Sequence, residues 1–206
     1  MRRTKITIAI NHLQNADVKL GDVISRVGRF TLRPNSDRFG MLVRSILAQQ
    51  VSTKAARAIW QRLEELILPD LISAESISRQ SVEDLRSVGI SGQKVSYLLD
   101  LSTHVLDERL RLRTIGRKTD AEVIEQLTAV KGIGEWTAQM FLIFSLGRMD
   151  ILPHADFGLR SALKILHNLE ELPDKATSLR LTEPWRPYAS VATWYCWRML
   201  ELPATE

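Results

Sequence analysis

Apolar residues recur every three or four positions along most of the chain, which is the period of amphipathic helices rather than of strands. The clearest repeat covers residues 39–47 and follows candidate cap residues at positions 35–37. A second repeat covers residues 55–66 and follows Ser52 or Thr53, either of which can cap a helix. Each repeat therefore predicts one amphipathic helix.

Weaker repeats predict the remaining helices. Ser81 and Asp84 have the spacing of a capping box, which would open a short helix that closes near Gly89. Further helices are predicted at about residues 95–101, at 123–127 behind Asp120, and at 135–146, 156–166 and 188–200. Only residues 6–10 alternate in the manner of a strand. The pattern predicts an all-α protein of about eight to ten helices joined by short loops.

Length and hydropathy narrow the class of protein. With 206 residues, of which 45% are hydrophobic and 25% charged, the chain is long enough for one globular unit or two small subdomains. Its longest apolar run, at residues 140–146, is much shorter than the roughly 20 residues of a bilayer span. Its first residues lack the apolar core of a signal peptide. We therefore expect a soluble intracellular protein that does not bind membranes.

Charge and cysteine content limit the partners and cofactors. The net charge of +4 and the pI near 9.4 are compatible with a polyanionic partner but do not require one. The single cysteine, Cys196, excludes an intramolecular disulfide, a four-cysteine zinc site and a four-cysteine iron–sulfur cluster.

A glycine pair, Gly132 and Gly134, encloses Ile133 within an apolar pattern that continues to Thr137 and Ala138. Such glycines allow a helix to end, reverse tightly and start again with the apolar residue held between them. The second helix then exposes unpaired N–H groups and its positive dipole end, which bind phosphate without reading a base. An ordinary αα-hairpin is the alternative, but the flanking apolar spacing favours the helix-hairpin-helix pattern.

Three separated segments carry a resemblance to a known family. They are FGMLVRSILAQQVS at residues 39–52, LTAVKGIGEWTAQMFLIFSLGRMDILPHADFGLRSAL at 127–163 and EPWRPYASVATWYCW at 183–197. Together they resemble the helix-hairpin-helix DNA glycosylases of the 3-methyladenine DNA glycosylase II type, over roughly residues 35–200. The chain is more similar to the compact, yeast-like members than to the longer bacterial ones, which have an additional N-terminal β domain.

The resemblance implies an all-α helix-hairpin-helix glycosylase fold, with an active-site cleft between two helical subdomains. One subdomain is expected at residues 35–148 and ends in the hairpin at about 127–146. The other combines residues 1–34 with 149–206 and carries the catalytic aspartate. The implied partner is double-stranded DNA containing alkylated bases. We expect a monomer that works with DNA inside the cell, in a bacterial cytoplasm or nucleoid or in a nucleus.

An aspartate follows the hairpin by about twenty residues in this family, and Asp156 matches that position. Cleavage of a glycosidic bond develops positive charge on the sugar, so a carboxylate close to C1′ stabilises the transition state and can orient water. An N-alkylated purine already carries positive charge and leaves without a partner acid. From the residues alone, a helix N-cap is the better interpretation of Asp156. The resemblance favours catalysis, and one residue can have both roles.

Trp136 separates this chain from the related glycosylase/lyases, which carry a nucleophilic lysine two residues after the second glycine. Lys131 lies on the other side of the turn and is better interpreted as a solvated or phosphate-facing lysine. We therefore expect hydrolysis by water, without strand cleavage, and no required cofactor.

The resemblance assigns the base pocket to Trp136, Met140, Phe157 and Trp194. Trp136 and Met140 are four residues apart and share one face of a helix. An indole face attracts a cationic base by about 1–2 kcal/mol when water is excluded. Aromatic residues at helical spacing are ordinarily core, which is how we interpret Trp60, Trp185 and Trp197.

A flipped base leaves a hole in the stack that a side chain must fill. Gln50 occupies the wedge position of the resembling motif, where family members often have leucine; a solvated glutamine at a helix end is the alternative. The main-chain carbonyls of Thr128, Val130 and Ile133 match a Na⁺ or K⁺ site of such hairpins. The predicted DNA contacts are Gln50, Lys131, Gly132, Ile133, Gly134 and Thr137.

These features together predict a monofunctional DNA glycosylase. It would flip out and hydrolyse alkylated purines such as 3-methyladenine and 7-methylguanine in base excision repair. One alternative is a non-catalytic helix-hairpin-helix DNA-binding protein, which would need the hairpin but not Asp156. Another is a glycosylase for other damaged bases, of which the lyase type is disfavoured by Trp136.

Overall fold

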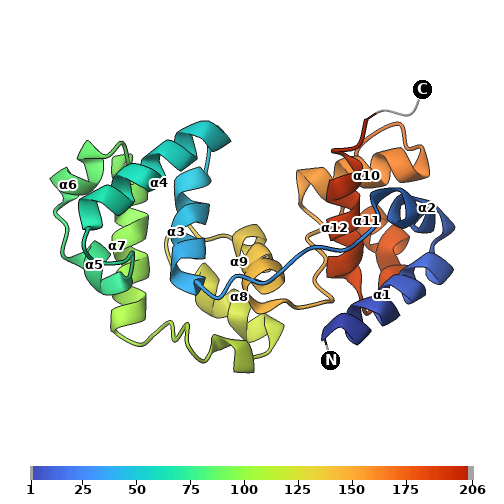
Figure 1. Cartoon of the computed structure of the whole chain (residues 1–206), viewed down its shortest axis with the longest axis horizontal. Helices are drawn as coiled ribbons and strands as arrows, with labels where there is room; N and C mark the ends of the chain where they lie inside the picture. The colour runs from blue at the N-terminus through green and yellow to red at the C-terminus, as the bar shows by residue number, and fades with distance from the viewer. Residues whose placement is uncertain (1, 204–206) are drawn as a thin grey trace. The chain divides into compact units, whose positions relative to one another are not determined.

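Every regular element within residues 2–203, which the computed structural model describes, is helical (Figure 1). The predicted all-α class is therefore confirmed. The chain forms two compact units: unit 1 combines Met1–Pro34 with Gly147–Glu206, and unit 2 is Asn35–Leu146. Helices from the beginning and the end of the sequence therefore belong to the same unit.

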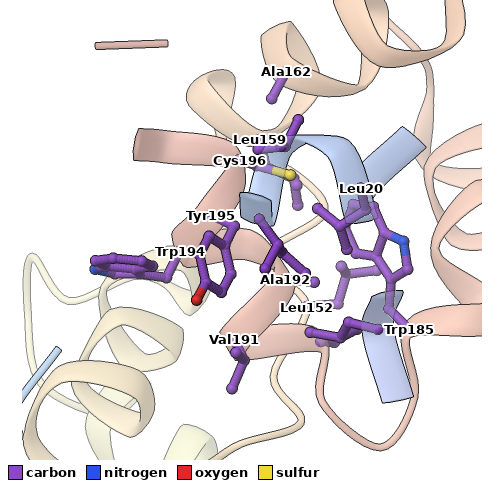
Figure 2. Close-up of a cluster of buried hydrophobic side chains, with 14 of the residues drawn as sticks. Leu20, Leu152, Leu159, Ala162, Trp185, Val191, Ala192, Trp194, Tyr195 and Cys196 are labelled. Carbon is purple, nitrogen blue, oxygen red and sulfur yellow. The ribbon is translucent and has the colours of Figure 1, made fainter. Parts of the chain in front are cut away.

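The helices of unit 1 pack around the last helix of the chain. They are α1 (Arg2–Ala16), α2 (Val18–Val27), α10 (Phe157–His167), α11 (Lys175–Thr182), a 3-10 turn (Glu183–Trp185) and α12 (Ala189–Met199). α12 contacts α2 and α10 and is buried along most of its length. Figure 2 shows the resulting core, in which Leu20 of α2 and Leu159 of α10 gather near Ala192 and Trp185.

Residues 6–10, whose alternation hints at a strand, are helical and lie inside α1. Ala9 and Leu13 are fully buried, with Ile6 and Ile10 packed beside them against the core of unit 1. The spacing of these four residues is three, one and three, which describes one helix face. The strand interpretation was wrong because five residues are too few to distinguish the alternation of a strand from the repeat of a helix.

Unit 2 is built around α3, which contacts α4, α7 and α9. Its elements are α3 (Arg38–Ala48), α4 (Thr53–Ile67), α5 (Ala74–Ser78), α6 (Val82–Ser87), α7 (Gly92–Leu106), a 3-10 turn (Ile115–Arg117), α8 (Asp120–Thr128), α9 (Glu135–Phe141) and a π-helical turn (Leu142–Leu146). The buried apolar face of α3 consists of Leu42, Val43, Ile46 and Leu47.

Side-chain caps start the two helices with the clearest repeats. Asp37 Oδ1 accepts the Gly40 N–H at 2.9 Å and opens α3. Ser52 Oγ accepts the Ala55 N–H at 3.2 Å and opens α4. Each bond satisfies a donor that has no partner inside its helix. The predicted starts of both helices are confirmed.

Capping boxes open two shorter helices. Ser81 and Asp84 form the predicted box at the start of α6. At α8 the cap is Thr119, which pairs with Glu122, and Asp120 is already the first helical residue. The helix predicted at 123–127 behind Asp120 therefore includes Asp120 itself, and Thr119 is its cap.

Twelve α-helices occur within residues 2–203, more than the sequence pattern predicts. α5 has five residues, which is too short to display a helical period. The helix predicted at 135–146 is α9 followed by a π-helical turn, and the chain leaves that turn at Gly147 with φ +66°. None of the helices in the described part of the chain has both the length and the apolar character needed to cross a membrane.

Candidate active site and nucleic-acid interface

The glycine turn connects α8 to α9 and has the geometry that its pattern predicts. Gly132 has φ +79°, and Gly134 is extended at φ −92° and forms the N-cap of α9. The Ile133 N–H donates to the Val130 carbonyl at 3.1 Å, and the Ile133 side chain is buried. The apolar residue is thus held between the two glycines, and the backbone reverses around it.

Gly132 is required for space as well as for conformation. A Cβ atom at this position would overlap the ring of Tyr97, which projects from α7. A Cβ at Gly134 would meet no atom within 4 Å. The two glycines therefore differ: the first lets α7 approach the turn, and the second leaves the start of α9 open.

The start of α9 is the helix end at which the sequence predicts phosphate binding, and that role stays a prediction. Gly134 offers no side-chain cap, so the first N–H groups of the helix are not satisfied by one. A surface hollow of about 500 Å³ lies along the turn, lined by Gln49, Tyr97 and residues 128–134. Thr137 is largely buried in the first turn of α9, whereas the other predicted contacts of the turn line the hollow.

Lys131 is anchored through its backbone rather than its ammonium group. Its N–H donates to Asp100 Oδ2 at 2.8 Å, while its Nζ lies 3.9 Å from Asp100 Oδ1. The side chain is 69% exposed. This geometry agrees with a solvated or phosphate-facing lysine.

Gln50 lies in the loop between α3 and α4, exposed, with φ +54°. Its neighbour Gln49 was not predicted to have a role, yet Gln49 Nε2 donates to the Gly132 carbonyl at 2.8 Å. The predicted wedge loop and the hairpin are therefore joined directly within unit 2. Sequence spacing gives no signal for this bond, because the two residues are 83 positions apart.

Asp156 is the N-cap of α10 and is buried, with 8% of its surface exposed. Its Oδ1 accepts the Leu159 N–H at 2.7 Å and the Trp197 indole N–H at 2.8 Å. The capping role is thus present in the structure. A catalytic role remains compatible with it, because the cap also holds the carboxylate in one orientation.

Trp197 is the residue whose role the sequence interpretation missed. The predicted core role is confirmed in part, because Trp197 packs against the core of unit 1 while only partly buried, but its Nε1–H also donates to Asp156 Oδ1. Gly158 leaves room for this contact, since a Cβ there would lie 3.0 Å from Trp197 Cδ1 and 3.2 Å from Asp156 Oδ1. Trp185 is fully buried, in agreement with a core role, whereas Trp60 is partly buried beneath the guanidinium of Arg44.

The four residues predicted to line the base pocket belong to different units. Trp136 and Met140 lie on α9 of unit 2, the first 47% exposed and the second buried. Phe157 opens α10 of unit 1 and is 71% exposed. Trp194 is buried in the core of unit 1, where its ring meets Phe30 edge-on with 4.7 Å between ring centroids. A common pocket of these residues stays a prediction.

The carbonyls of Thr128, Val130 and Ile133 belong to residues that line the hollow beside the glycine turn. The Val130 carbonyl accepts the Ile133 N–H, but a carbonyl oxygen has two lone pairs and can also bind a cation. These hard oxygen donors fit Na⁺ or K⁺. Within the described residues, no group of three histidine, cysteine or acidic side chains is placed to hold a metal ion.

Comparisons with known proteins agree on one family. Residues 43–187 match the model of the HhH-GPD superfamily base excision DNA repair proteins. DNA-3-methyladenine glycosylase 1 of Schizosaccharomyces pombe is 32% identical over 97% of this chain and 90% of the relative.

Two solved structures share the architecture and more than 30% of the aligned residues. The DNA-3-methyladenine glycosidase of Bacillus halodurans has a TM-score of 0.83 and 38% identity, covering 92% of this chain and 87% of that one. The S. pombe 3-methyladenine DNA glycosylase in complex with abasic DNA has a TM-score of 0.83 and 31% identity, covering 96% and 99%.

Proposed function

Because the chain belongs to the HhH-GPD superfamily of base excision DNA repair proteins, we propose that it is a DNA glycosylase for alkylated purines. It flips bases such as 3-methyladenine and 7-methylguanine out of double-stranded DNA and removes them by hydrolysis. The observation that carries the proposal is the place of Asp156, a buried carboxylate with two N–H donors that follows the glycine turn in the chain at the position expected of the catalytic aspartate. The names of the similar proteins, which are 3-methyladenine glycosylases, support the substrate class.

In the proposed reaction the N-glycosidic bond breaks and its electron pair passes to the departing base. An alkylated purine is cationic before cleavage and leaves as a neutral base, so no general acid is needed. Positive charge develops on the sugar, and the carboxylate of Asp156 stabilises it. A water oxygen then bonds to C1′ and releases a proton, for which Asp156 is the acceptor.

The proposed enzyme acts with water alone and has no lyase step. Lyases of this superfamily carry a lysine nucleophile where this chain has Trp136. The nearby Lys131 has its backbone bonded to Asp100 and its ammonium beside the same carboxylate. Lys131 precedes the first glycine of the turn, on the opposite side of the turn from Trp136, so it does not stand at the position of the lyase nucleophile.

The proposed base pocket selects for charge as well as shape. The exposed indole of Trp136 offers an electron-rich face to a cationic base. Phe157, beside the catalytic carboxylate and exposed, offers a second aromatic surface. An undamaged purine lacks the positive charge that these rings attract, so it binds and leaves less readily.

In the proposed complex, the glycine turn binds the DNA backbone. The N–H groups at the start of α9 bind one phosphate, with Lys131 beside them. A monovalent cation held by the carbonyls of Thr128, Val130 and Ile133 would add positive charge at the same hollow. We further propose that the protein works as a monomer inside the cell, where its DNA substrate is.

Product analysis tests the proposed function directly. Duplex DNA treated with a methylating agent is incubated with the protein, and released bases are separated by chromatography. We expect free 3-methyladenine and 7-methylguanine, with no release from untreated DNA. Binding to DNA without base release would instead favour the non-catalytic DNA-binding alternative.

A further inference from the structure

The loop that carries Gln50 begins where α3 ends and its last carbonyls lose their helical partners. Helices commonly end with a glycine in the left-handed conformation. This loop places glutamine there, with φ +54°. A side chain makes that conformation less favourable, so other contacts must hold the loop.

Lys94, in the first turn of α7, supplies such contacts. Its Nζ donates to the Leu47 carbonyl at 2.8 Å and to the Gln49 carbonyl at 2.6 Å. These two oxygens flank the end of α3, where the helix dipole is negative and a cation is stabilising. Withdrawal from solvent lowers the pKa of the Lys94 amine below its ordinary value.

The same face of α7 also fixes the hairpin. Tyr97, three residues after Lys94, packs on Gly132, and Asp100, three residues further, accepts the Lys131 N–H at 2.8 Å. Gln49 completes the link, because its main chain is bound by Lys94 and its side chain by the Gly132 carbonyl. Figure 1 shows α3, α7 and α8 within unit 2, where this network lies.

We propose that Lys94 is the positioning residue of the Gln50 wedge, fixing the loop in its left-handed conformation and in a constant relation to the hairpin. The inference rests on the proposed function, since a wedge acts only where a base leaves the stack. Two of the three N–H donors of Lys94 are used by carbonyls, which leaves one donor at most for a phosphate. The side chain of Lys131, in contrast, is 69% exposed to solvent.

The consequence is a preorganised wedge. Without the ammonium group, the carbonyls of Leu47 and Gln49 lose their shared donor and Gln50 relaxes to other conformations. DNA with a gap in its stack must then order the loop on binding, which weakens the complex. Intact DNA, which is bound through the hairpin, is unaffected.

Binding of two duplexes tests the role of Lys94 without any bond cleavage. Lys94→Met keeps an unbranched apolar side chain that is one atom shorter and removes its donors. Fluorescence anisotropy compares a duplex carrying one tetrahydrofuran abasic-site analogue with the same duplex intact. We expect about tenfold weaker binding to the abasic duplex, the order of a lost charge-assisted hydrogen bond, and unchanged binding to the intact duplex.

Lys54→Met is the matched control, because Lys54 is an exposed lysine in the first turn of the helix that follows the same loop. If Lys54 contacts phosphate, its loss weakens binding to both duplexes equally. It also lowers by about one the slope of the logarithm of the binding constant against the logarithm of the salt concentration. The same pattern in Lys94→Met would overturn the proposal, because it would identify a phosphate ligand.

Coupling between the lysine and the wedge gives an independent measurement. Gln50→Ala combined with Lys94→Met should weaken abasic-duplex binding by less than the product of the two single effects. Purely multiplicative effects would contradict a role that acts through Gln50.

A measurement on the wild type covers the case in which Lys94→Met does not fold. Brief acetylation followed by mass spectrometry should modify Lys94 more slowly than Lys54 and Lys131; equal rates would refute the carbonyl contacts. A wild type without preference for the abasic duplex would count against the proposed function. An unchanged preference in Lys94→Met would count against the role of Lys94 alone.

Discussion

Asp156 and Trp197 are joined by a hydrogen bond of 2.8 Å from the indole Nε1 to the carboxylate Oδ1. The same oxygen accepts the Leu159 N–H at 2.7 Å, so two donors fix the carboxylate from two directions. A carboxylate that stabilises charge at a particular sugar atom must be held in such a fixed orientation. The helix cap and the indole together provide it.

Asp17 shows that this arrangement alone does not identify an active site. Asp17 caps α2 by accepting the Leu20 N–H at 3.1 Å, and its other oxygen accepts the Trp185 indole N–H at 2.8 Å. Two capping aspartates in unit 1 thus each bind a tryptophan. The position of Asp156 after the hairpin separates it from Asp17, which makes Asp17 and Trp185 useful references.

Asp156→Asn should abolish base release while leaving the fold intact. Asparagine is as good a helix cap as aspartate and keeps an oxygen for both donors, so the melting temperature should change little. The loss of the negative charge should lower the rate of base release by roughly a hundredfold or more. Chromatography of released bases and calorimetry check the two expectations. Normal activity in this variant would remove Asp156 from the mechanism.

Trp197→Phe should lower kcat by about tenfold with little change in KM. Phenylalanine keeps most of the packing but cannot donate to Asp156, so the carboxylate loses its second support. KM should stay close to the wild-type value because the substitution does not alter the DNA contacts of the hairpin. Steady-state kinetics on an oligonucleotide with one alkylated base separates the two constants.

Trp185→Phe is the control for that variant. It removes the equivalent indole donor from Asp17, in the core of unit 1. The free energy of unfolding should fall by about 1–2 kcal/mol, since a buried bond and some packing are lost. Its kcat should equal that of the wild type. An equal loss of kcat in both variants would assign Trp197 a structural role only.

The sequence predicts those features that depend on residues within one or two helical turns of each other. Asp37 and Ser52 act three residues away, and the Gly132 turn closes over a single residue, so spacing alone reveals them. Trp197 binds an aspartate 41 positions earlier, and Lys94 binds a carbonyl 47 positions earlier. Such contacts depend on which helices pack together, and hydrophobic periodicity does not encode the pairing of helices.

Gly132→Ala should destabilise the protein much more than Gly134→Ala. Alanine at 132 must adopt φ +79° and would overlap the Tyr97 ring, so we expect a loss above about 1 kcal/mol. Gly134 is extended and open, so alanine there meets no clash and loses only the advantage of glycine as an N-cap, which should cost less than about 1 kcal/mol. Urea unfolding followed by circular dichroism measures both. Equal losses would contradict the distinct roles of the two glycines.

Borohydride treatment during turnover should trap no covalent complex between the wild-type protein and DNA. Trapping requires an amine that attacks C1′ and forms a Schiff base, and Trp136 offers none at the position used by related lyases. A glycosylase/lyase of the same superfamily, run in parallel on its own substrate, shows that the conditions are adequate. A trapped adduct that disappears in Lys131→Ala would identify Lys131 as a nucleophile and overturn hydrolysis by water. Base release without an adduct leaves Asp156 and water as the reacting partners.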